Sequence, residues 1–287
     1  MTITQLTIFL KVAETGSFTK AGKVLHMTQP AVSRAISNLE AELDVKLIIR
    51  DRKNGIMLTD VGKRLLIQIR EILQGFEKME QEIAAEKGLE IGTIRIGAFP
   101  TASAFFLPKI LRAIEQKYPN LQFELYEGIM NQVEEWLVSR VIDVGIINSS
   151  NEELEMIPFY QDKMIAVLRD DHPLQKKAHI HINDLDQVPL IICKGGNELP
   201  IVHIFEETKT TLKVKFVVHN TNALLNMIQE GLGVAIISEL SLTTLPPNVQ
   251  IRDVQPNILR EINLAVPSLG DTSLAAQLFI DTAKKLF

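Results

Sequence analysis

One short segment, residues 28–39, constrains the fold of this chain more than any other. Thr28 can cap a helix, and Pro30 falls in the first turn, where a missing N–H does no harm. At about 100° per residue the helix has one apolar face, made of Val32, Ala35, Ile36 and Leu39. The opposite face is polar and short-chained, and consists of Gln29, Pro30, Ser33, Arg34 and Ser37. The segment therefore predicts a helix that buries one side and presents the other to a partner.

Two helices are predicted before this segment. The first has an apolar face of Leu6, Phe9, Leu10 and Ala13, and Gly16 ends it. Ser17 can cap the second, whose predicted buried face is Phe18, Ala21, Val24 and Leu25. Three short helices in this order predict a small three-helix unit.

The polar face of the third helix has side chains suited to a DNA major groove. Gln can hydrogen-bond adenine, Arg can bind guanine or phosphate, and a Pro ring can touch a thymine methyl. Residues 1–64 hold ten Lys and Arg against six Asp and Glu, whereas the remaining residues hold 20 against 29. A basic segment on an acidic body favours a polyanionic partner. The alternative is a plain three-helix unit with a polar exterior.

A basic hairpin is predicted after the third helix. Residues 46–50 and 56–59 have strand patterns, and Asn54-Gly55 between them is a strong hairpin signal. Arg50, Arg52 and Lys53 lie on this hairpin, where they would bind phosphates without reading sequence. A helix-turn-helix with a basic wing is the expected assembly.

A long helix follows, from about residue 60 to residue 87. Its apolar residues are spaced four, three, four, three and four apart, as in a coiled-coil seam: Leu65, Ile69, Ile72, Phe76, Met79 and Ile83. We expect this helix to pair two subunits. An amphipathic helix that packs within one chain is the alternative, because the seam spans barely three heptads.

Beyond residue 91, strands and helices alternate, which predicts a parallel or mixed sheet with helices on its faces. The pattern occurs twice, so we expect two α/β lobes with a cleft at the carboxyl ends of their strands. Three strand–helix junctions supply hydroxyl groups, backbone N–H groups and one cation to this cleft. The predicted ligand-binding residues are Pro100, Thr101, Ala102, Ser103, Asn148, Cys193, Lys194, Gly195 and Thr221. Taken singly, each residue is more simply explained as a helix cap or a turn, and the three junctions around one cleft together favour ligand binding.

No pattern in the chain indicates an enzyme. The phosphate-binding, nucleophile-elbow and dinucleotide-binding glycine motifs are absent from the sequence. His179 and His181 would point to one face of a strand, but no third metal ligand follows at useful spacing beyond Asp184 and Asp186. Cys193 beside Lys194 could be a redox-sensing thiol, and a buried cysteine at a strand end is the simpler interpretation. No metal and no cofactor are expected.

Composition bounds the location of the protein. The first residues lack a basic region followed by an apolar stretch, and no apolar run reaches the roughly 18 residues of a membrane span. The single cysteine excludes an intrachain disulfide and is typical of a reducing compartment. We therefore expect a cytoplasmic protein with no membrane partner.

The first 62 residues resemble the DNA-binding domain of LysR-type transcriptional regulators. The resemblance rests on matches in register, which are Leu6, Phe9, Val12, Ala13, Gly16, Ser17, Phe18, Ala21, Leu25, the run 28–34, Ile36, Leu39, Glu40, Leu43, Leu47, Arg50, Leu58, Thr59 and Gly62. It implies that Gln29, Pro30, Ser33 and Arg34 face DNA, with Arg50 and Arg52 near its backbone. The DNA-binding residues that we predict also include Thr28, Ser37 and Lys53. Gly22, Asp44 and Ile48 depart from the family pattern.

The remainder resembles the periplasmic-binding-protein-like effector domain of the same family. Matches include Leu107-Pro108, Tyr118-Pro119, His172-Pro173-Leu174 and the run 230–235. Thr101 matches the position whose hydroxyl often holds an effector carboxylate, whereas Met130 stands where many relatives carry Ser or Thr. The resemblance implies double-stranded promoter or operator DNA and a small, anionic effector as partners, with RNA polymerase as a candidate partner. It also implies a homo-oligomer, dimer or tetramer, because the linker helix and the effector domain can each dimerise.

We therefore expect an α/β chain with an N-terminal winged helix-turn-helix. The predicted domains are a DNA-binding domain (1–59), a linker and dimerisation helix (60–88) and a two-lobed effector domain (91–287). Lobe I would span about 91–161 and 267–287, and lobe II about 162–266. The predicted function is sequence-specific transcriptional regulation under control of a small molecule. A solute-binding module, a nonspecific DNA-binding protein and an α/β enzyme using Cys193 or the histidines are the alternatives.

Overall fold

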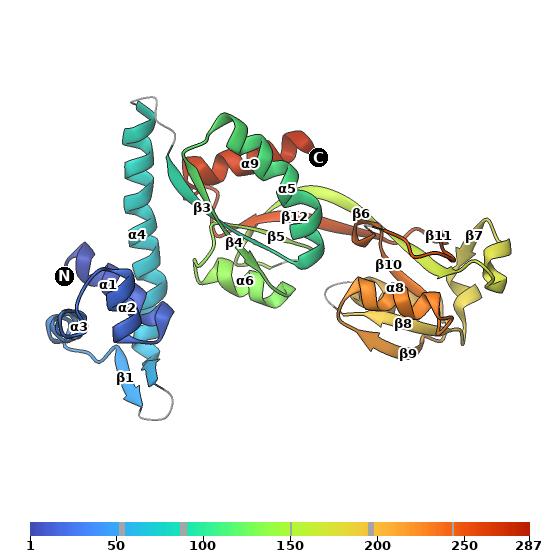
Figure 1. The fold of residues 1–287 in the computed structure, drawn as a ribbon, viewed down its shortest axis with the longest axis horizontal. Helices are drawn as coiled ribbons and strands as arrows, with labels where there is room; N and C mark the ends of the chain where they lie inside the picture. Colours follow the sequence, from blue (N-terminus) through green and yellow to red (C-terminus); the bar gives the residue numbers. More distant parts are fainter. Residues whose placement is uncertain (52–54, 87–90, 150, 195–197, 243) are drawn as a thin grey trace. The chain divides into compact units, whose positions relative to one another are not determined.

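The computed structural model describes residues 1–51, 55–86, 91–149, 151–194, 198–242 and 244–287. The chain forms two compact units (Figure 1). One contains Met1–Gly92 with Ser139–Val141, and the other contains Thr93–Val138 with Ile142–Phe287.

The N-terminal unit is a three-helix domain with a two-stranded hairpin and one long helix. Its elements are α1 (Ile3–Thr15), α2 (Phe18–Val24), α3 (Gln29–Leu43), β1 (Ile48–Asp51), β2 (Gly55–Leu58) and α4 (Asp60–Glu86). The predicted caps are confirmed, because Gly16 ends α1 with a φ of 61° and the hydroxyls of Ser17 and Thr28 accept from Lys20 N and Ala31 N. Phe9, Val12, Val32 and Leu39 are completely buried in the core.

Two details of this unit differ from the sequence prediction. Val24 is 55% exposed, and the buried face of α2 contains Gly22 in its place. The first strand of the hairpin begins at Ile48, two residues later than predicted, and the backbone N–H groups of Leu47 and Ile48 donate to a side chain of α3. The second strand, Gly55–Leu58, begins and ends one residue earlier than predicted.

The three departures from the family pattern all fit the fold. A Cβ on Gly22 would lie 2.6 Å from the carbonyl oxygen of Met27, so only glycine fits where α2 meets the turn. Asp44 ends α3 with a φ of 52°, a left-handed conformation that Asp adopts more readily than most residues. Ile48 is buried in the core of the unit. Local geometry is therefore preserved at each position.

The long helix α4 has two parts that differ in exposure. At its start, Ile69 is buried and Leu65 packs beside it in the core of the three-helix domain. Further along, Ile72, Phe76, Met79 and Ile83 are between 41% and 57% exposed. The first positions of the predicted seam thus serve the chain's own core, and the last four are available to a partner.

The first lobe of the second unit is a sheet covered by helices. It contains β3 (Gly92–Ala98), α5 (Pro100–Lys117), β4 (Leu121–Glu127), α6 (Met130–Val138), β5 (Val144–Ile147) and α9 (Leu274–Leu286). β3 and β5 are parallel neighbours. α5 and α9 lie side by side (Figure 1), and their residues share one core. Gly145 leaves room for Val133 and Leu137 of α6.

One strand, β6 (Glu155–Arg169), runs through both lobes (Figure 1). Its first part pairs with β12 (Leu259–Val266), and its last residues pair with β10 (Ala235–Ser238) and β11 (Val249–Gln255). β12 also pairs with β5, and its side chains lie in the first lobe's core. The expectation that lobe II extends to about residue 266 therefore differs from the strand pairing, because residues 262–266 of β12 pair with strands of the first lobe.

The second lobe completes the sheet and adds a parallel pair of strands. β7 (His179–His181) is parallel to β11, and β8 (Pro189–Cys193) is parallel to β9 (Lys213–Val218). Its helices are α7 (Glu198–Glu207) and α8 (Thr221–Gln229), with short 3-10 turns η1 (Pro173–Lys176), η2 (Ile182–Leu185) and η3 (Glu239–Ser241). Among the described residues, no helix is long and apolar enough to cross a membrane.

Gly22 of α2 and Gly75 of α4 should respond in opposite ways to alanine. Gly22→Ala should lower the stability of the N-terminal unit by about 1–3 kcal/mol, because its Cβ would press on the Met27 carbonyl. Gly75→Ala meets nothing within 4 Å and should raise stability by about 0.5–1 kcal/mol through helix propensity. Scanning calorimetry of the full chain measures both. Equal shifts of the same sign would contradict the packing of Gly22.

Candidate DNA-binding face and ligand-binding residues

The DNA-binding residues predicted on the third helix lie together on the outer face of α3. Gln29, Pro30, Arg34 and Ser37 are exposed, and Ser33 is half-buried beside them. Val32, Ile36 and Leu39 on the opposite face are at most 2% exposed. Thr28 is exposed as well, but its hydroxyl accepts from Ala31 N and so caps the helix. The face predicted from the sequence is thus available to a partner along the length of α3.

The wing is only partly described. The backbone of Arg50 lies in β1 opposite Ile56, and Gly55 pairs with Asp51. Arg52 and Lys53 lie outside the described residues. Their predicted contacts with phosphates therefore stay predictions.

A buried carboxylate connects α3 to the wing. Glu40 is 8% exposed, and its Oε1 accepts hydrogen bonds from the backbone N–H groups of Leu47 (2.9 Å) and Ile48 (3.1 Å). Its Oε2 accepts from Lys46 Nζ at 2.8 Å. At the other end of the hairpin, Thr59 Oγ1 donates to the Lys46 carbonyl at 2.8 Å and accepts from Gly62 N. These bonds fix where the wing begins and ends relative to α3 and α4.

The environment of Glu40 favours its charged form. Burial raises the pKa of this carboxyl, but the hydrogen bonds from Lys46, Leu47 and Ile48 outweigh burial and leave the pKa below its ordinary value. Glu40 was matched to the family pattern in the sequence, but no local signal indicated that its partners would be in the wing.

In the first lobe, the predicted ligand residues lie at the carboxyl ends of β3 and β5. α5 begins at Pro100, because proline is tolerated in a first helical turn. Thr101 and Ser103 are half-buried in that turn, whereas Ala102 is buried in the core. Asn148 follows β5, and its backbone N–H donates to Met130 Sδ at 3.5 Å. Met130 therefore supplies an apolar surface next to Asn148.

In the second lobe, the predicted residues lie at the carboxyl ends of β8 and β9. Cys193 is 6% exposed and packs in a core cluster, as expected of a buried strand-end cysteine. Lys194 is exposed, and its backbone N–H donates to the Val218 carbonyl. Thr221 is the first residue of α8, capped by the Asn220 side chain. Gly195 lies outside the described residues.

The sequence did not predict a buried ion pair where the two lobes join. Arg260 of β12 donates to Asp162 Oδ2 of β6 from Nε (3.1 Å) and Nη2 (2.5 Å), and both side chains are at most 3% exposed. The same oxygen accepts from Ser238 Oγ at 2.6 Å, and Leu240 N lies 3.4 Å from Oδ1. Burial lowers the pKa of Arg260, while Asp162 opposes that shift. The pair ties β6 and β12 to the end of β10.

This ion pair also positions a hydroxyl opposite a predicted ligand residue. Leu240 packs into the core of the first lobe, and the adjacent Ser241 Oγ lies 3.5 Å from Thr101 Oγ1. Arg260 lies 5.4 Å from the ring of Phe99, the residue before α5. Ser241 is thus a further ligand candidate that sequence reasoning missed, because it lies 140 residues from Thr101.

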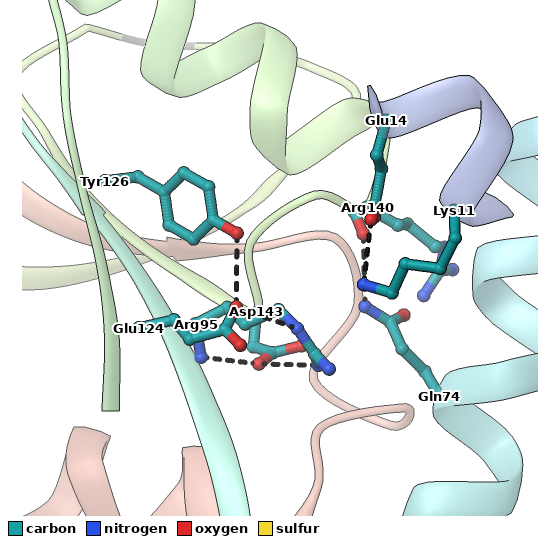
Figure 2. Close-up of polar contacts among 8 residues, drawn as sticks. All are labelled: Lys11, Glu14, Gln74, Arg95, Glu124, Tyr126, Arg140 and Asp143. Atoms are coloured by element: carbon teal, nitrogen blue, oxygen red, sulfur yellow. Dashed lines mark hydrogen bonds and ion pairs between the residues drawn. The ribbon is translucent and has the colours of Figure 1, made fainter. Parts of the chain in front are cut away.

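A polar network sets the register of the strands that precede the ligand residues (Figure 2). Arg95 N donates to Asp143 Oδ2 at 2.8 Å, and Asp143 N donates to the Arg95 carbonyl at 2.8 Å. The Arg95 side chain also lies within ion-pair distance of Glu124 and Asp143. These contacts align β3 with β5, and so place Thr101 and Asn148 at one end of the sheet.

The two histidines singled out in the sequence are neighbours. Their rings lie 5.0 Å apart on β7, on one face of the strand as predicted. Within the described part of the chain, no group of three or more His, Cys, Asp or Glu residues could hold a metal ion.

Two family models match successive parts of the chain. Residues 3–63 match the bacterial regulatory helix-turn-helix proteins of the lysR family, and residues 87–287 match the LysR substrate binding domain. An uncharacterized HTH-type transcriptional regulator of Bacillus subtilis, YvbU, is 57% identical over 100% of this chain and 99% of its own length. The transcriptional activator CmpR of Synechocystis is 27% identical over 98% of this chain and 94% of its own.

Solved structures share the same fold. A full-length OxyR variant from Pseudomonas aeruginosa has a TM-score of 0.80 at 20% identity, and covers 99% of this chain and 95% of its own. Full-length CbnR in complex with its target DNA has a TM-score of 0.67 at 22% identity, and covers 99% of both chains.

Replacing Glu40 by Gln should weaken the attachment of the wing. Glu40→Gln should lower the stability of the N-terminal unit by about 1.5–3 kcal/mol at pH 7, because it removes charge-assisted bonds. In the wild type these bonds contribute stability above the ordinary pKa of 4.5, and that stability is lost as the pH falls through the lowered pKa. The variant should therefore lose less stability on acidification.

Calorimetry at several pH values between 3 and 7 tests this expectation, with the exposed Glu42→Gln as the matched control. We call the hydrogen bonds of Glu40 with residues 46–48 the Glu40 clamp. If stability falls in parallel with pH for wild type and Glu40→Gln, the clamp is contradicted.

Proposed function

The chain belongs to the LysR family of transcriptional regulators, and we propose that it binds specific DNA sequences through α3 and its wing. It is a DNA-binding regulator with an effector-binding domain, not an enzyme. The observation that carries the specific proposal is the outer face of α3, where Gln29, Pro30 and Arg34 are exposed beside half-buried Ser33. A helix with these side chains can hydrogen-bond base edges in a major groove.

The wing has a different role in this proposal. Arg50, Arg52 and Lys53 would contact phosphates and so orient α3 without reading sequence. The Glu40 clamp supports this division, because it fixes the hairpin relative to α3. Phosphate contacts predict that DNA affinity falls steeply with salt concentration.

The effector is proposed to be a small anion that binds between the two lobes. The N-terminus of α5 lacks a side-chain cap. Its backbone N–H groups can therefore donate hydrogen bonds to an oxyanion next to Thr101 and Ser103. Asn148, Lys194, Thr221 and Ser241 would contact the ligand from neighbouring strand and turn ends. Met130 beside Asn148 favours a ligand with an apolar portion.

The effector would act by binding two arrangements of the subunits with unequal affinity. Two chains are proposed to pair through the exposed part of α4, which presents Ile72, Phe76, Met79 and Ile83. Paired recognition helices would bind the two halves of an interrupted palindrome, and further pairing of effector domains would give a tetramer.

Arg34→Ala should weaken specific DNA binding by about 1–3 kcal/mol, because one bidentate base contact is lost. The duplex is one that the wild type selects from random sequences, and fluorescence anisotropy measures affinity. Arg112→Ala is the matched control, because Arg112 is an exposed arginine of the effector domain.

Both variants should keep the wild-type unfolding temperature, since both side chains are exposed. Equal affinity of Arg34→Ala and wild type for the selected duplex would remove Arg34 from the interface.

Phe76→Glu should halve the mass of the oligomer in sedimentation, because a charge replaces an apolar side chain in the proposed seam. Leu274→Glu, at a 53% exposed position of α9, should leave the mass unchanged. The same mass for Phe76→Glu and wild type would contradict pairing through α4.

A further inference from the structure

A basic depression lies on the second lobe, away from the residues assigned to the effector. It is formed by residues 176–178, from the end of η1 to the start of β7, and by residues 251–253 of β11. Its volume is about 510 Å³. The parallel pairing of Asp253 with His179 and of Val254 with Ile180 holds the two walls together. The depression is therefore built on the sheet and not on a loop alone.

The charges around this depression do not cancel. Its lining contains three cations, Lys176, Lys177 and Arg252. Lys177 pairs with Asp184 at 2.6 Å, and the lining carboxylate Asp253 pairs with Lys163 at 2.5 Å. Within the described part of the chain, Lys176 and Arg252 have no carboxylate partner. Two positive charges are thus left over on a body that is acidic from residue 65 to residue 287.

The guanidinium of Arg252 is held in place by the backbone. Its Nε donates to the Lys177 carbonyl (3.2 Å), Nη2 to the Gln175 carbonyl (3.1 Å) and Nη1 to the Ile251 carbonyl (2.8 Å). Three of its five N–H donors are used in this way, so two can bind a ligand. The side chain therefore loses little conformational freedom when it binds a ligand.

We propose that this depression is a second ligand site, which binds a phosphate group through Lys176 and Arg252. A planar guanidinium suits two oxygens of one oxyanion, and an adjacent ammonium adds a point charge. The depression is shallow and open to solvent, and it has room for inorganic phosphate or a phosphomonoester. The proposal does not rest on the effector assigned to the region between the lobes.

Calorimetric titration of the full-length protein with inorganic phosphate tests the proposal. Lys176→Glu should weaken phosphate binding at least tenfold, because it reverses a charge whose side chain forms no hydrogen bond or ion pair in the described structure. Lys213→Glu makes the same charge change at an exposed lysine of the same lobe and should leave binding unchanged. Glycerol phosphate, titrated in parallel, should show the same dependence on Lys176.

Thr101→Val separates this site from the proposed effector site, and it should leave phosphate binding intact. Weak binding that both charge-reversed variants reduce equally would show a general charge effect and overturn the proposal. Loss of binding in Thr101→Val with retention in Lys176→Glu would place the phosphate between the lobes instead. Absence of binding to the wild type would also overturn it.

Discussion

The carboxylate of Glu40 is the interaction on which the DNA-binding half depends. A buried charge is costly to desolvate, and it is tolerated here because two backbone N–H groups and one ammonium group bind it. Each donor comes from residues 46–48, where the wing begins. The same bonds that stabilise the carboxylate therefore hold the hairpin against α3, as the proposed base and phosphate contacts require.

The effector half also contains a buried carboxylate bound by several donors, at the place where its two lobes join. Asp162 accepts hydrogen bonds from Arg260, Ser238 and Leu240, which belong to β12, β10 and η3. Removing one partner of such a pair would leave an uncompensated buried charge, so the geometry of this junction is strongly specified. Through Leu240 and Ser241 the junction reaches Thr101, so a ligand beside Thr101 would act on the elements that join the lobes.

The sequence predicted local features well and long-range pairing poorly. Helix caps at Gly16, Ser17 and Thr28 depend on neighbouring residues, and all three were predicted. Val24 was predicted to be buried, but it is 55% exposed. Helical spacing alone does not show against which neighbour a helix packs. The pairing of residues 262–266 with the first lobe was not predicted, because strand partners more than 90 residues apart have no local signature. The Asp162–Arg260 pair was missed for the same reason. The proposed roles of the DNA-binding and ligand-binding residues stay predictions.

Nuclease footprinting on DNA upstream of the protein's own gene tests the central claim most directly. The account predicts two protected half-sites related by an interrupted palindrome, whose protection changes when a pool of small cellular anions is added. Uniform protection of this DNA and of scrambled DNA would contradict it, because the face of α3 would then not read sequence.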